Sequence, residues 1–274
     1  MFTLHHKDRT LSVEKPLVMG ILNLTPDSFY SGSRYQTLDH ILLQTEQMLE
    51  QGASLVDIGG QSTRPGSTRI PAPEEWARIE MPLKELIKRF PKIFISIDTY
   101  YAEVAKRSLN EGAFMINDIS AGTMDALMLE TVAEAEAPYV IMHMRGTPTT
   151  MQEYTQYADV TAEVIDYLQQ RHAICMQAGI TQVVIDPGFG FAKTISQNFE
   201  LMSELEQFSA LPCPLLLGIS RKSFIYKTLD VMPEQALNGS TFLHAIGLQK
   251  GARILRVHDV KEAVESVRLF ERLR

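Results

Sequence analysis

The stretch IFISIDTYYAEVAKRSLNEGAFMINDI at residues 93–119 decides the fold, because it places a helix-length segment between two short apolar strands. The strands, IFISID (93–98) and MINDI (115–119), are almost continuously apolar and carry polar side chains near their ends. The segment between them closes on Gly112, and Gly readily adopts the positive φ required at a helix C-terminus. Such apolar runs are typical of strands that are buried on both faces of a parallel sheet.

The same alternation of strand and helix continues in both directions along the chain. The other candidate strands are LVMGILN (17–23), LVDIGG (55–60), YVIMH (139–143), VVIDPG (183–188), LLLGIS (215–220) and ILRVHD (254–259). A glycine also precedes strands in QGAS (51–54), QAGI (177–180) and KGAR (250–253). Amphipathic helices lie between the strands, as along Val260, Ala263, Val264, Val267 and Phe270.

Eight strand–helix units in about 250 residues predict an α/β fold of the parallel (β/α)8, or TIM, barrel type. A doubly wound open sheet has the same alternation and is the alternative. The count of eight and the polar residues at one end of nearly every strand favour the barrel. Because no linker or change of composition divides the chain, we expect a single domain over residues 1–274. The first 15 residues are expected to form a hairpin at the barrel bottom.

Composition excludes several classes of protein. The chain has 274 residues, is 45% hydrophobic and carries a net charge of −7 without a basic block, so nucleic-acid binding is not expected. No apolar run reaches the length of about 18 residues that spans a membrane, and the N-terminus does not resemble a signal peptide. We therefore expect a cytoplasmic protein. Cys175 and Cys213 are expected in the core, and His5 and His6 at the surface.

Polar residues follow nearly every candidate strand, where the C-terminal ends of barrel strands share one mouth. A single Asp in this position is more often a helix N-cap than part of a site. Capping, however, does not require Arg, Lys and His in the same ring. The residues are Asn23, Asp57, Asp98, Asn117, Asp118, His143, Asp186, Ser220, Arg221, Lys222, Arg256 and His258.

One subset suits a flat nitrogenous ring. The carboxylates of Asp98 and Asp186 and the amide of Asn117 could pair with adjacent N–H donors on the edge of a heterocycle. Lys222 could donate to a carbonyl of the same ring.

A second subset suits a phosphate or pyrophosphate. Its donors are Arg64, Arg256, His258, Ser62 and Thr63. Lys222 also opens a helix, whose N-terminus favours negative charge. Asn23 offers a hard oxygen ligand, and Mg²⁺ commonly takes one or two protein ligands together with phosphate and water. These residues together predict a planar nitrogenous substrate that bears a phosphate or diphosphate.

Two loops rich in Pro, Gly and Ser follow the first two strands, at residues 23–35 and 59–73. Long loops over a barrel mouth are frequently lids, although each loop taken alone could be a solvated connector. Phe29 favours the lid, because an aromatic side chain in a polar loop is costly unless it covers a ligand or core. GFGFAK (188–193) fits neither the Walker pattern nor a full GxGxxG motif.

Eight motifs in order resemble the dihydropteroate synthases, a family of pterin-binding barrels. They are MGILNLTPDSF (19–29), DIGGQSTRPG (57–66), SIDT (96–99), INDI (116–119), MHMRGTP (142–148), DPGFGFAK (186–193), GISRKS (218–223) and RVHDV (256–260). The resemblance covers nearly the whole chain. It implies a role in folate biosynthesis, the condensation of (7,8-dihydropterin-6-yl)methyl diphosphate with 4-aminobenzoate, a Mg²⁺ cofactor and a homodimer.

The resemblance also implies roles for individual residues. The pterin ring would be bound by Asp98, Asn117, Asp186 and Lys222. The diphosphate would be held by Asn23, Arg256 and His258, with Arg256 stacked on the pterin and Asn23 ligating Mg²⁺. The two loops would contribute Asp27, Ser28, Phe29, Ser62, Thr63 and Arg64. Aminobenzoate, and sulfonamides that mimic it, would lie near Phe29, Pro65, Lys222 and Ser223. The catalytic set implied is Asn23, Arg64, Asp98, Lys222 and Arg256.

The sequence departs from the family pattern at a few positions outside that set. Gln61 replaces the usual Glu before STRPG, Ala192 replaces a common Gly, Ser240 replaces a frequent Thr, and Ser31-Gly32-Ser33 replaces Asp-Gly-Gly.

Three alternative functions remain open. A methyltetrahydrofolate-binding barrel would require no diphosphate site, which Arg64 and Arg256 argue against. A pterin-binding barrel without catalysis would not need Asn23 or Lys222. A phosphosugar isomerase or aldolase would place a Lys or Glu centrally, without two carboxylates for one flat ring.

Overall fold

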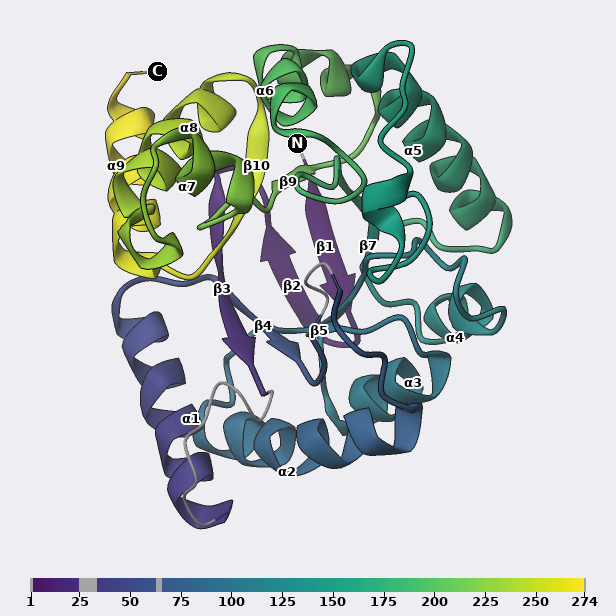
Figure 1. Ribbon diagram of the computed structural model, residues 1–274. Helices are drawn as coiled ribbons and strands as arrows, with labels where there is room; N and C mark the ends of the chain where they lie inside the picture. Colours follow the sequence, from purple (N-terminus) through teal and green to yellow (C-terminus); the bar gives the residue numbers. More distant parts are fainter. Residues whose placement is uncertain (1, 25–33, 63–65, 274) are drawn as a thin grey trace.

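Eight parallel strands close into a barrel in the computed structural model, which describes residues 2–24, 34–62 and 66–273 (Figure 1). The strands are β3 (Leu17–Asn23), β4 (Leu55–Gly59), β5 (Ile95–Asp98), β6 (Met115–Asp118), β7 (Tyr139–Met142), β8 (Val183–Asp186), β9 (Leu215–Leu217) and β10 (Ala252–Val257). Because β10 pairs with both β9 and β3, the sheet has no edge. The TIM barrel expected from the sequence is confirmed, and the open doubly wound sheet is excluded.

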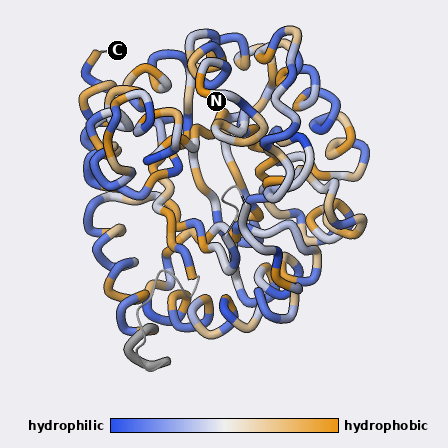
Figure 2. The backbone as a smooth tube through the Cα atoms, viewed as in Figure 1, coloured by the Kyte–Doolittle hydropathy of each residue, from blue (hydrophilic) through white to orange (hydrophobic). Residues whose placement is uncertain are grey.

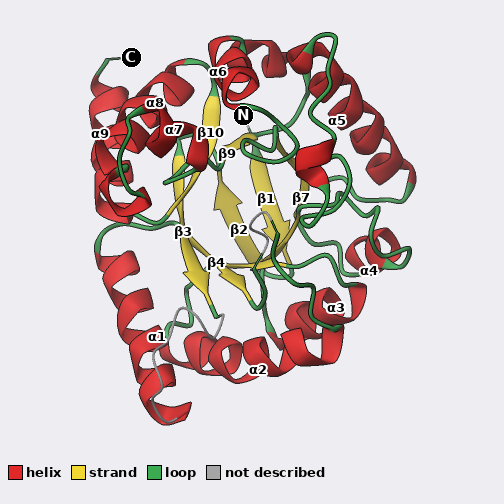
Figure 3. Cartoon of the chain, in the orientation of Figure 1, coloured by secondary structure: helices red, strands yellow, loops and turns green. Residues whose placement is uncertain are grey.

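Helices surround the ring of strands (Figure 3). They are α1 (Arg34–Glu50), α2 (Ala72–Arg89), α3 (Ala102–Glu111), α4 (Met128–Glu134), α5 (Val160–Gln177), α6 (Ile195–Ser203), α7 (Ser223–Thr228), α8 (Leu237–Gln249) and α9 (Val260–Arg272), with 3-10 turns η2 (Met151–Glu153), η3 (Leu205–Ala210) and η4 (Pro233–Gln235). The helix-ending glycines Gly52, Gly112, Gly179 and Gly251 have φ values of 102°, 113°, 91° and 105°. The C-terminal role expected of them is confirmed.

Successive strand residues face opposite sides, which separates two apolar cores. Outward residues such as Ile58, Ile116 and Ile185 pack with the helices. Inward residues form a second cluster inside the barrel, made of Met19, Leu55, Met115, Val140, Val184, Leu216 and Ile254. Figure 2 shows hydrophobic residues along the strands and hydrophilic ones on much of the outer helix surface.

A hairpin of β1 (Thr3–His6) and β2 (Arg9–Ser12) is drawn across the centre of the strand ring in Figure 1. Leu4 and Leu11 face each other in its register and pack into the inner apolar cluster, together with Val13. The hairpin therefore covers the apolar end of the barrel interior.

The expectation that both histidines lie at the surface is wrong for His6. His5 is exposed, but His6 is only 4% exposed, and its ring meets that of Phe114 edge-on with centroids 6.4 Å apart. Alternation explains the difference, because His6 faces the same side of the hairpin as Leu4. Burial lowers the pKa of His6. Cys175 and Cys213 are buried, as expected.

None of the helices in the described part of the chain is long and apolar enough to cross a membrane.

Candidate active site

The inward positions that follow the apolar layer carry the polar groups of the mouth. Asp57, Asn117, Asp186 and Arg256 each lie two residues beyond an inward apolar residue of the same strand. Asp98 holds the equivalent place on β5. A two-residue period therefore turns these side chains toward one another at the C-terminal ends of the strands.

Arg256 lies at the centre of this group and joins β10 to β4 and β5. Its Nε donates to Asp57 Oδ2 at 2.6 Å, and its Nη2 donates to Asp98 Oδ2 at 2.7 Å. Asn117 Nδ2 donates to the same Asp57 oxygen at 3.0 Å. Asp57 is fully buried, while Asp98 and Asn117 are 7% and 5% exposed. The structure thus brings together three of the predicted site residues around a fourth residue, Asp57.

Burial and charge oppose each other in this cluster. Burial raises the pKa of Asp98 to about 7, with the Arg256 guanidinium acting against that rise. For Arg256, burial lowers the pKa, but the carboxylates of Asp57 and Asp98 outweigh burial and hold the pKa above its ordinary value. A neutral ligand that pairs with Asp98 must therefore compete with a strong cationic partner.

Asp186 and Lys222 both approach Gly218. A Cβ atom on Gly218 would lie 3.5 Å from Asp186 Oδ2 and 4.0 Å from Lys222 Nζ. Burial lowers the pKa of Lys222 to about 8 against the effect of the Asp186 carboxylate, and burial raises the pKa of Asp186. An acceptor and a donor therefore lie close together beside Gly218, as the edge of a flat heterocycle with both kinds of group would require.

The loop after β8 positions both members of that pair. Gly188 N donates to Asp186 Oδ1 at 2.7 Å. Lys222 Nζ donates to the carbonyl of Phe189 and lies 4.8 Å from the centre of the Phe191 ring. Lys222 directly precedes α7, as predicted, and Ser223 is the first residue of that helix.

Asn23 and His258 lie at the two strand ends that flank this arrangement. A Cβ atom on Gly59 would lie 3.8 Å from Asn23 Oδ1 and 3.7 Å from Asp98 Cβ, so the Asn23 amide and Asp98 border the same space. His258 follows β10; its backbone N–H donates to Ser220 Oγ at 3.1 Å, and its ring Nδ1 lies 3.2 Å from the same oxygen. Both side chains therefore belong to the rim of the mouth.

An apolar cluster borders the polar mouth at the ends of β5, β6 and β7. Its buried members are Tyr100, Ile119, Met142, Met144, Met151 and Ala192. Apolar walls with a few convergent polar groups are the usual form of a small-molecule site.

Two other polar residues of the strand ends, Asp118 and Arg221, point elsewhere. Asp118 faces outward, accepting from Tyr139 Oη at 2.6 Å and from Ser120 N at 2.7 Å. Arg221 makes a bidentate ion pair with Asp259, at 3.0 and 2.5 Å.

His143 Nδ1 lies 3.0 Å from Lys193 Nζ, and both side chains are buried. Burial lowers the pKa of each of these two groups. Lys193 also donates to the Gly188 and Phe191 carbonyls, at 2.9 and 3.1 Å. Lys193 therefore stabilises the loop that carries Phe189. The motif GFGFAK alone did not predict this structural role.

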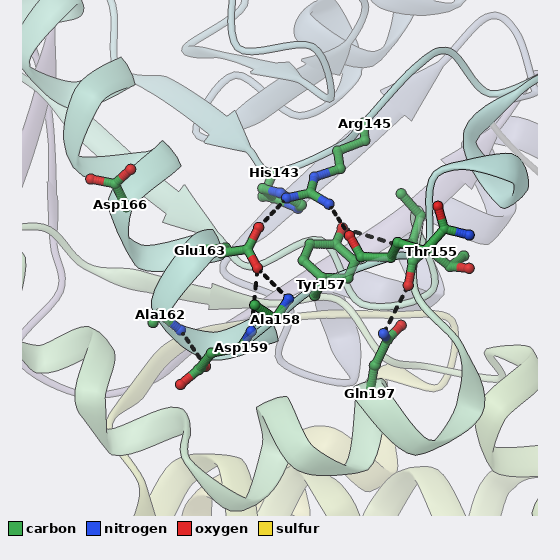
Figure 4. A network of polar contacts seen from close by, with 12 residues as sticks. His143, Arg145, Thr155, Tyr157, Ala158, Asp159, Ala162, Glu163, Asp166 and Gln197 are labelled. Carbon is green, nitrogen blue, oxygen red and sulfur yellow. Dashed lines mark hydrogen bonds and ion pairs between the residues drawn. The ribbon is translucent and has the colours of Figure 1, made fainter.

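A polar network behind that loop connects it to the segment between β7 and α5 (Figure 4). Arg145 donates to Glu163 at 2.5 Å and lies 3.8 Å from the centre of the Tyr157 ring. Tyr157 Oη in turn donates to the Ala192 carbonyl at 2.9 Å, and Gln197 Nε2 donates to Thr155 O at 2.8 Å. Arg145 of the MHMRGTP motif, together with Tyr157 and Gln197, which lie outside the motifs, thus fixes the backbone that supports Lys222.

The described part of the second loop is attached to the barrel at several points. Gly66 N donates to Pro148 O at 3.1 Å, and Ser67 Oγ donates to Ser62 O at 2.7 Å. Arg69 Nε donates to Tyr101 Oη at 2.6 Å. A cavity of about 80 Å³ lies beneath, lined in part by Ser62 and Met124. Thr63, Arg64, Pro65, Asp27, Ser28 and Phe29 lie outside the described residues.

Gln61, which replaces the usual Glu, contacts a buried carboxyl group. Its Nε2 donates to Glu75 Oε2 at 2.6 Å, and its Oε1 accepts from Tyr100 Oη at 2.7 Å. Glu75 on α2 is fully buried, and burial raises its pKa to about 8. The sequence analysis missed Glu75, because its position in a helix gives no hint of contact with the mouth.

Comparison with known proteins agrees with this geometry. A family model described as "Pterin binding enzyme" matches residues 19–258. The dihydropteroate synthase of Escherichia coli K12 is 43% identical over 264 residues, covering 96% of this chain and 93% of that protein. That of Bacillus subtilis is 41% identical over 271 residues, covering 98% and 92%.

Solved structures give the same answer. Dihydropteroate synthase of Yersinia pestis, in a sulfonamide drug complex, has a TM-score of 0.93 and 39% identity, covering 100% of this chain and 99% of that one. The Xanthomonas albilineans enzyme with 4-aminobenzoic acid has a TM-score of 0.92 and 37% identity, covering 99% and 97%. The chain therefore belongs to the pterin binding enzyme family and, within it, to the dihydropteroate synthases.

Proposed function

We propose that the protein condenses (7,8-dihydropterin-6-yl)methyl diphosphate with 4-aminobenzoate, giving 7,8-dihydropteroate and pyrophosphate for folate biosynthesis. The observation that carries the proposal is the set of inward polar groups at one end of the barrel, where Asp98, Asn117, Asp186, Lys222 and Arg256 converge. Solved relatives from Xanthomonas albilineans with 4-aminobenzoic acid and with 7,8-dihydropteroate support these substrates.

The pterin ring is bound by groups that match its edge. Two carboxylates, Asp98 and Asp186, accept from ring N–H groups, and Lys222 donates to the ring carbonyl from the far side of Gly218. The arrangement is supported by the burial of both carboxylates, with Lys222 half-buried beside them, because hydrogen bonds to charged groups discriminate strongly when water is excluded. The bound carboxylates also stabilise positive charge on the ring.

The diphosphate is held by Arg256, His258 and Asn23 at the rim. The Asn23 amide oxygen is a hard ligand that lies beside Gly59 and close to Asp98, so the residues present fit a Mg²⁺ ion, which commonly takes one or two protein ligands together with phosphate and water. When bound, Mg²⁺ would neutralise charge on the departing diphosphate. Arg64 and Thr63 of the second loop would complete this anion site.

Replacement of the diphosphate by the arylamine then depends more on the positioning of the substrates and on electrostatic stabilisation of charge than on acid–base catalysis. The C–O bond to the diphosphate breaks with its electron pair on the leaving group, which leaves a cationic methylene on the pterin. The lone pair of the neutral arylamine forms the new C–N bond, and the amine releases one proton. Aminobenzoate would lie near Phe29, Pro65, Lys222 and Ser223, where a sulfonamide would compete with it. Closure of the two loops would keep water from the cation.

We also propose that the enzyme is a cytoplasmic homodimer. Its two cysteines are free and buried, as suits a reducing compartment. Phe242 on α8 and Leu269 on α9 are 65% and 70% exposed, and large exposed apolar side chains are common at subunit interfaces. Sedimentation of the purified protein tests this, since a mass near that of one chain would contradict it.

The activity is tested by pyrophosphate release with both substrates and Mg²⁺, and again without 4-aminobenzoate. We expect one pyrophosphate for each 7,8-dihydropteroate, and release that falls to background when the arylamine is omitted. Absence of pyrophosphate with both substrates would contradict the proposal and favour a barrel that only binds pterin.

A further inference from the structure

We propose that Asp57 is a positioning residue for the reaction, which sets both the Arg256 guanidinium and the direction of the Asn117 amide. The inference rests on the proposed function and adds a residue that does not itself touch substrate. Three strands meet at this side chain, because Asp57 is on β4, Asn117 on β6 and Arg256 on β10. Its exposed fraction is 0%.

One oxygen of Asp57 accepts both hydrogen bonds. Oδ2 receives Asn117 Nδ2 at 3.0 Å and Arg256 Nε at 2.6 Å, while Oδ1 has no hydrogen-bond partner among the described residues. A buried carboxylate is costly unless it is paired, and here the guanidinium supplies the pairing. The carboxylate is thereby fixed between two groups of the mouth.

The contact with Asn117 determines what that residue offers to a ligand. An ionised carboxylate can only accept hydrogen bonds, so the amide must turn its NH2 end toward Asp57. The amide oxygen then faces away from Asp57, and Asn117 presents an acceptor. An amide in place of Asp57 could either donate or accept, which would permit both orientations of Asn117. Asp57 therefore makes Asn117 an acceptor for an N–H group of the pterin.

Asp57 binds one end of the Arg256 guanidinium, and a ligand could displace the partner of the other end. Nε is bound to Asp57, whereas Nη2 is bound to Asp98, a carboxylate assigned to the pterin ring. The ion pair with Asp98 is the one that ring binding at this carboxylate would displace. The bond to Asp57 remains, and it serves as the pivot from which the guanidinium moves over the ring toward the diphosphate.

The test uses Asp57→Asn, which keeps the shape and removes the charge. Dissociation constants for 6-hydroxymethyl-7,8-dihydropterin are measured by calorimetry, with KM and kcat for both substrates. We expect pterin binding to weaken by about 30-fold or more, as is usual when one member of a buried charge pair is lost. The KM for 4-aminobenzoate should change by less than about threefold, because Asp57 does not act on that substrate.

Asp118→Asn is the matched control, because Asp118 is an equally buried carboxylate that faces outward to Tyr139. It should lower the unfolding midpoint and leave the pterin dissociation constant within about threefold. In an Arg256→Ala background, the effect of Asp57→Asn should shrink several-fold, since coupled residues are not additive. An undiminished effect there, or unchanged pterin binding in Asp57→Asn, would overturn the proposal.

A second measurement follows the native enzyme and needs one variant for signal assignment. The arginine Nε–H signals are followed by ¹⁵N NMR, with Arg256 assigned from Arg256→Lys. We expect the Arg256 Nε–H to stay protected from exchange when pterin saturates the site, and loss of protection would contradict the pivot. Failure of this proposal can be distinguished from failure of the proposed function. If the native enzyme binds pterin but releases no pyrophosphate, the proposed condensation is wrong, whereas the role of Asp57 is still tested by pterin binding.

Discussion

Two side chains in the mouth have pKa values displaced toward neutrality from opposite directions. Burial raises the pKa of Asp98 to about 7 and lowers the pKa of Lys222 to about 8. Ring binding requires Asp98 ionised and Lys222 protonated. The first condition is lost as pH falls through about 7, and the second as pH rises through about 8.

The affinity for 6-hydroxymethyl-7,8-dihydropterin should therefore follow a bell-shaped pH profile with a maximum between pH 7 and 8. Calorimetric titrations across pH 5.5–9.5 measure it. Lys222→Arg should move the alkaline limb upward, because a guanidinium does not lose its proton in this range. A flat profile in the native enzyme would show that neither group titrates against the ring.

At the scale of elements, α2 reaches the mouth through one buried carboxyl group. Burial raises the pKa of Glu75 from 4.5 to about 8 in the folded protein. Because the folded state binds this proton more tightly than the unfolded state, the free energy of unfolding decreases as pH rises from about 4.5 to about 8. The loss is on the order of 5 kcal/mol once the group ionises in both states.

Glu75→Gln should remove that dependence, because the amide keeps a partner for Gln61 without titrating. Urea unfolding at pH 6 and pH 9 measures the slope. Glu85→Gln, at the surface of the same helix, should retain the native slope. If Glu75→Gln and the native protein lose stability equally between these pH values, another group is responsible.

The turn after β8 requires glycine at position 188. Gly188 has a φ of 71°, and a Cβ atom there would lie 2.0 Å from the His143 carbonyl oxygen. Gly188→Ala should reduce the free energy of unfolding by about 3 kcal/mol or more. Gly251→Ala is the control for backbone strain alone, since Gly251 has a φ of 105° and no atom within 4 Å of such a Cβ.

Gly251→Ala should reduce the free energy of unfolding by only about 1 kcal/mol. Chemical denaturation of both variants measures the difference, and similar losses in the two would mean that the close contact with His143 is unimportant.

The strands could be predicted from sequence because their apolar runs are continuous, but their ends could not. LLLGIS was expected to be a strand to residue 220, whereas β9 ends at Leu217. Gly218 instead lies beside Asp186, and Ser220 accepts a hydrogen bond from His258. Polar residues that follow a strand can continue it or leave it, and only the tertiary contacts decide.

Local sequence patterns could predict some residues of the site but not the contacts between them. Asp98 and Asp186 could be predicted as site residues because each ends an apolar run. Asp57 was recognised as a strand-end residue, but its contact with Asn117 spans 60 positions and its contact with Arg256 spans 199. No local pattern encodes such pairs.

At the scale of the whole molecule, the barrel separates an apolar end, covered by the hairpin, from the polar end where we propose that the pterin binds. Leu4 is 3% exposed and packs into the inner cluster. Leu4→Ala should lower the free energy of unfolding by about 2–5 kcal/mol and leave pterin affinity unchanged. Thr3→Ala, at an exposed position of the same strand, serves as the control. Weaker pterin binding by the folded Leu4→Ala protein would show that the two ends are coupled.

The central claim is that inward side chains at the C-terminal strand ends recognise the pterin. Its most direct test is the dissociation constant of 6-hydroxymethyl-7,8-dihydropterin for Asp186→Asn, measured by calorimetry beside the native protein. We expect binding to weaken by about 100-fold or more, because ring N–H groups would lose a buried charged acceptor. Near-native affinity in a folded Asp186→Asn protein would contradict the assignment of the mouth as the pterin site.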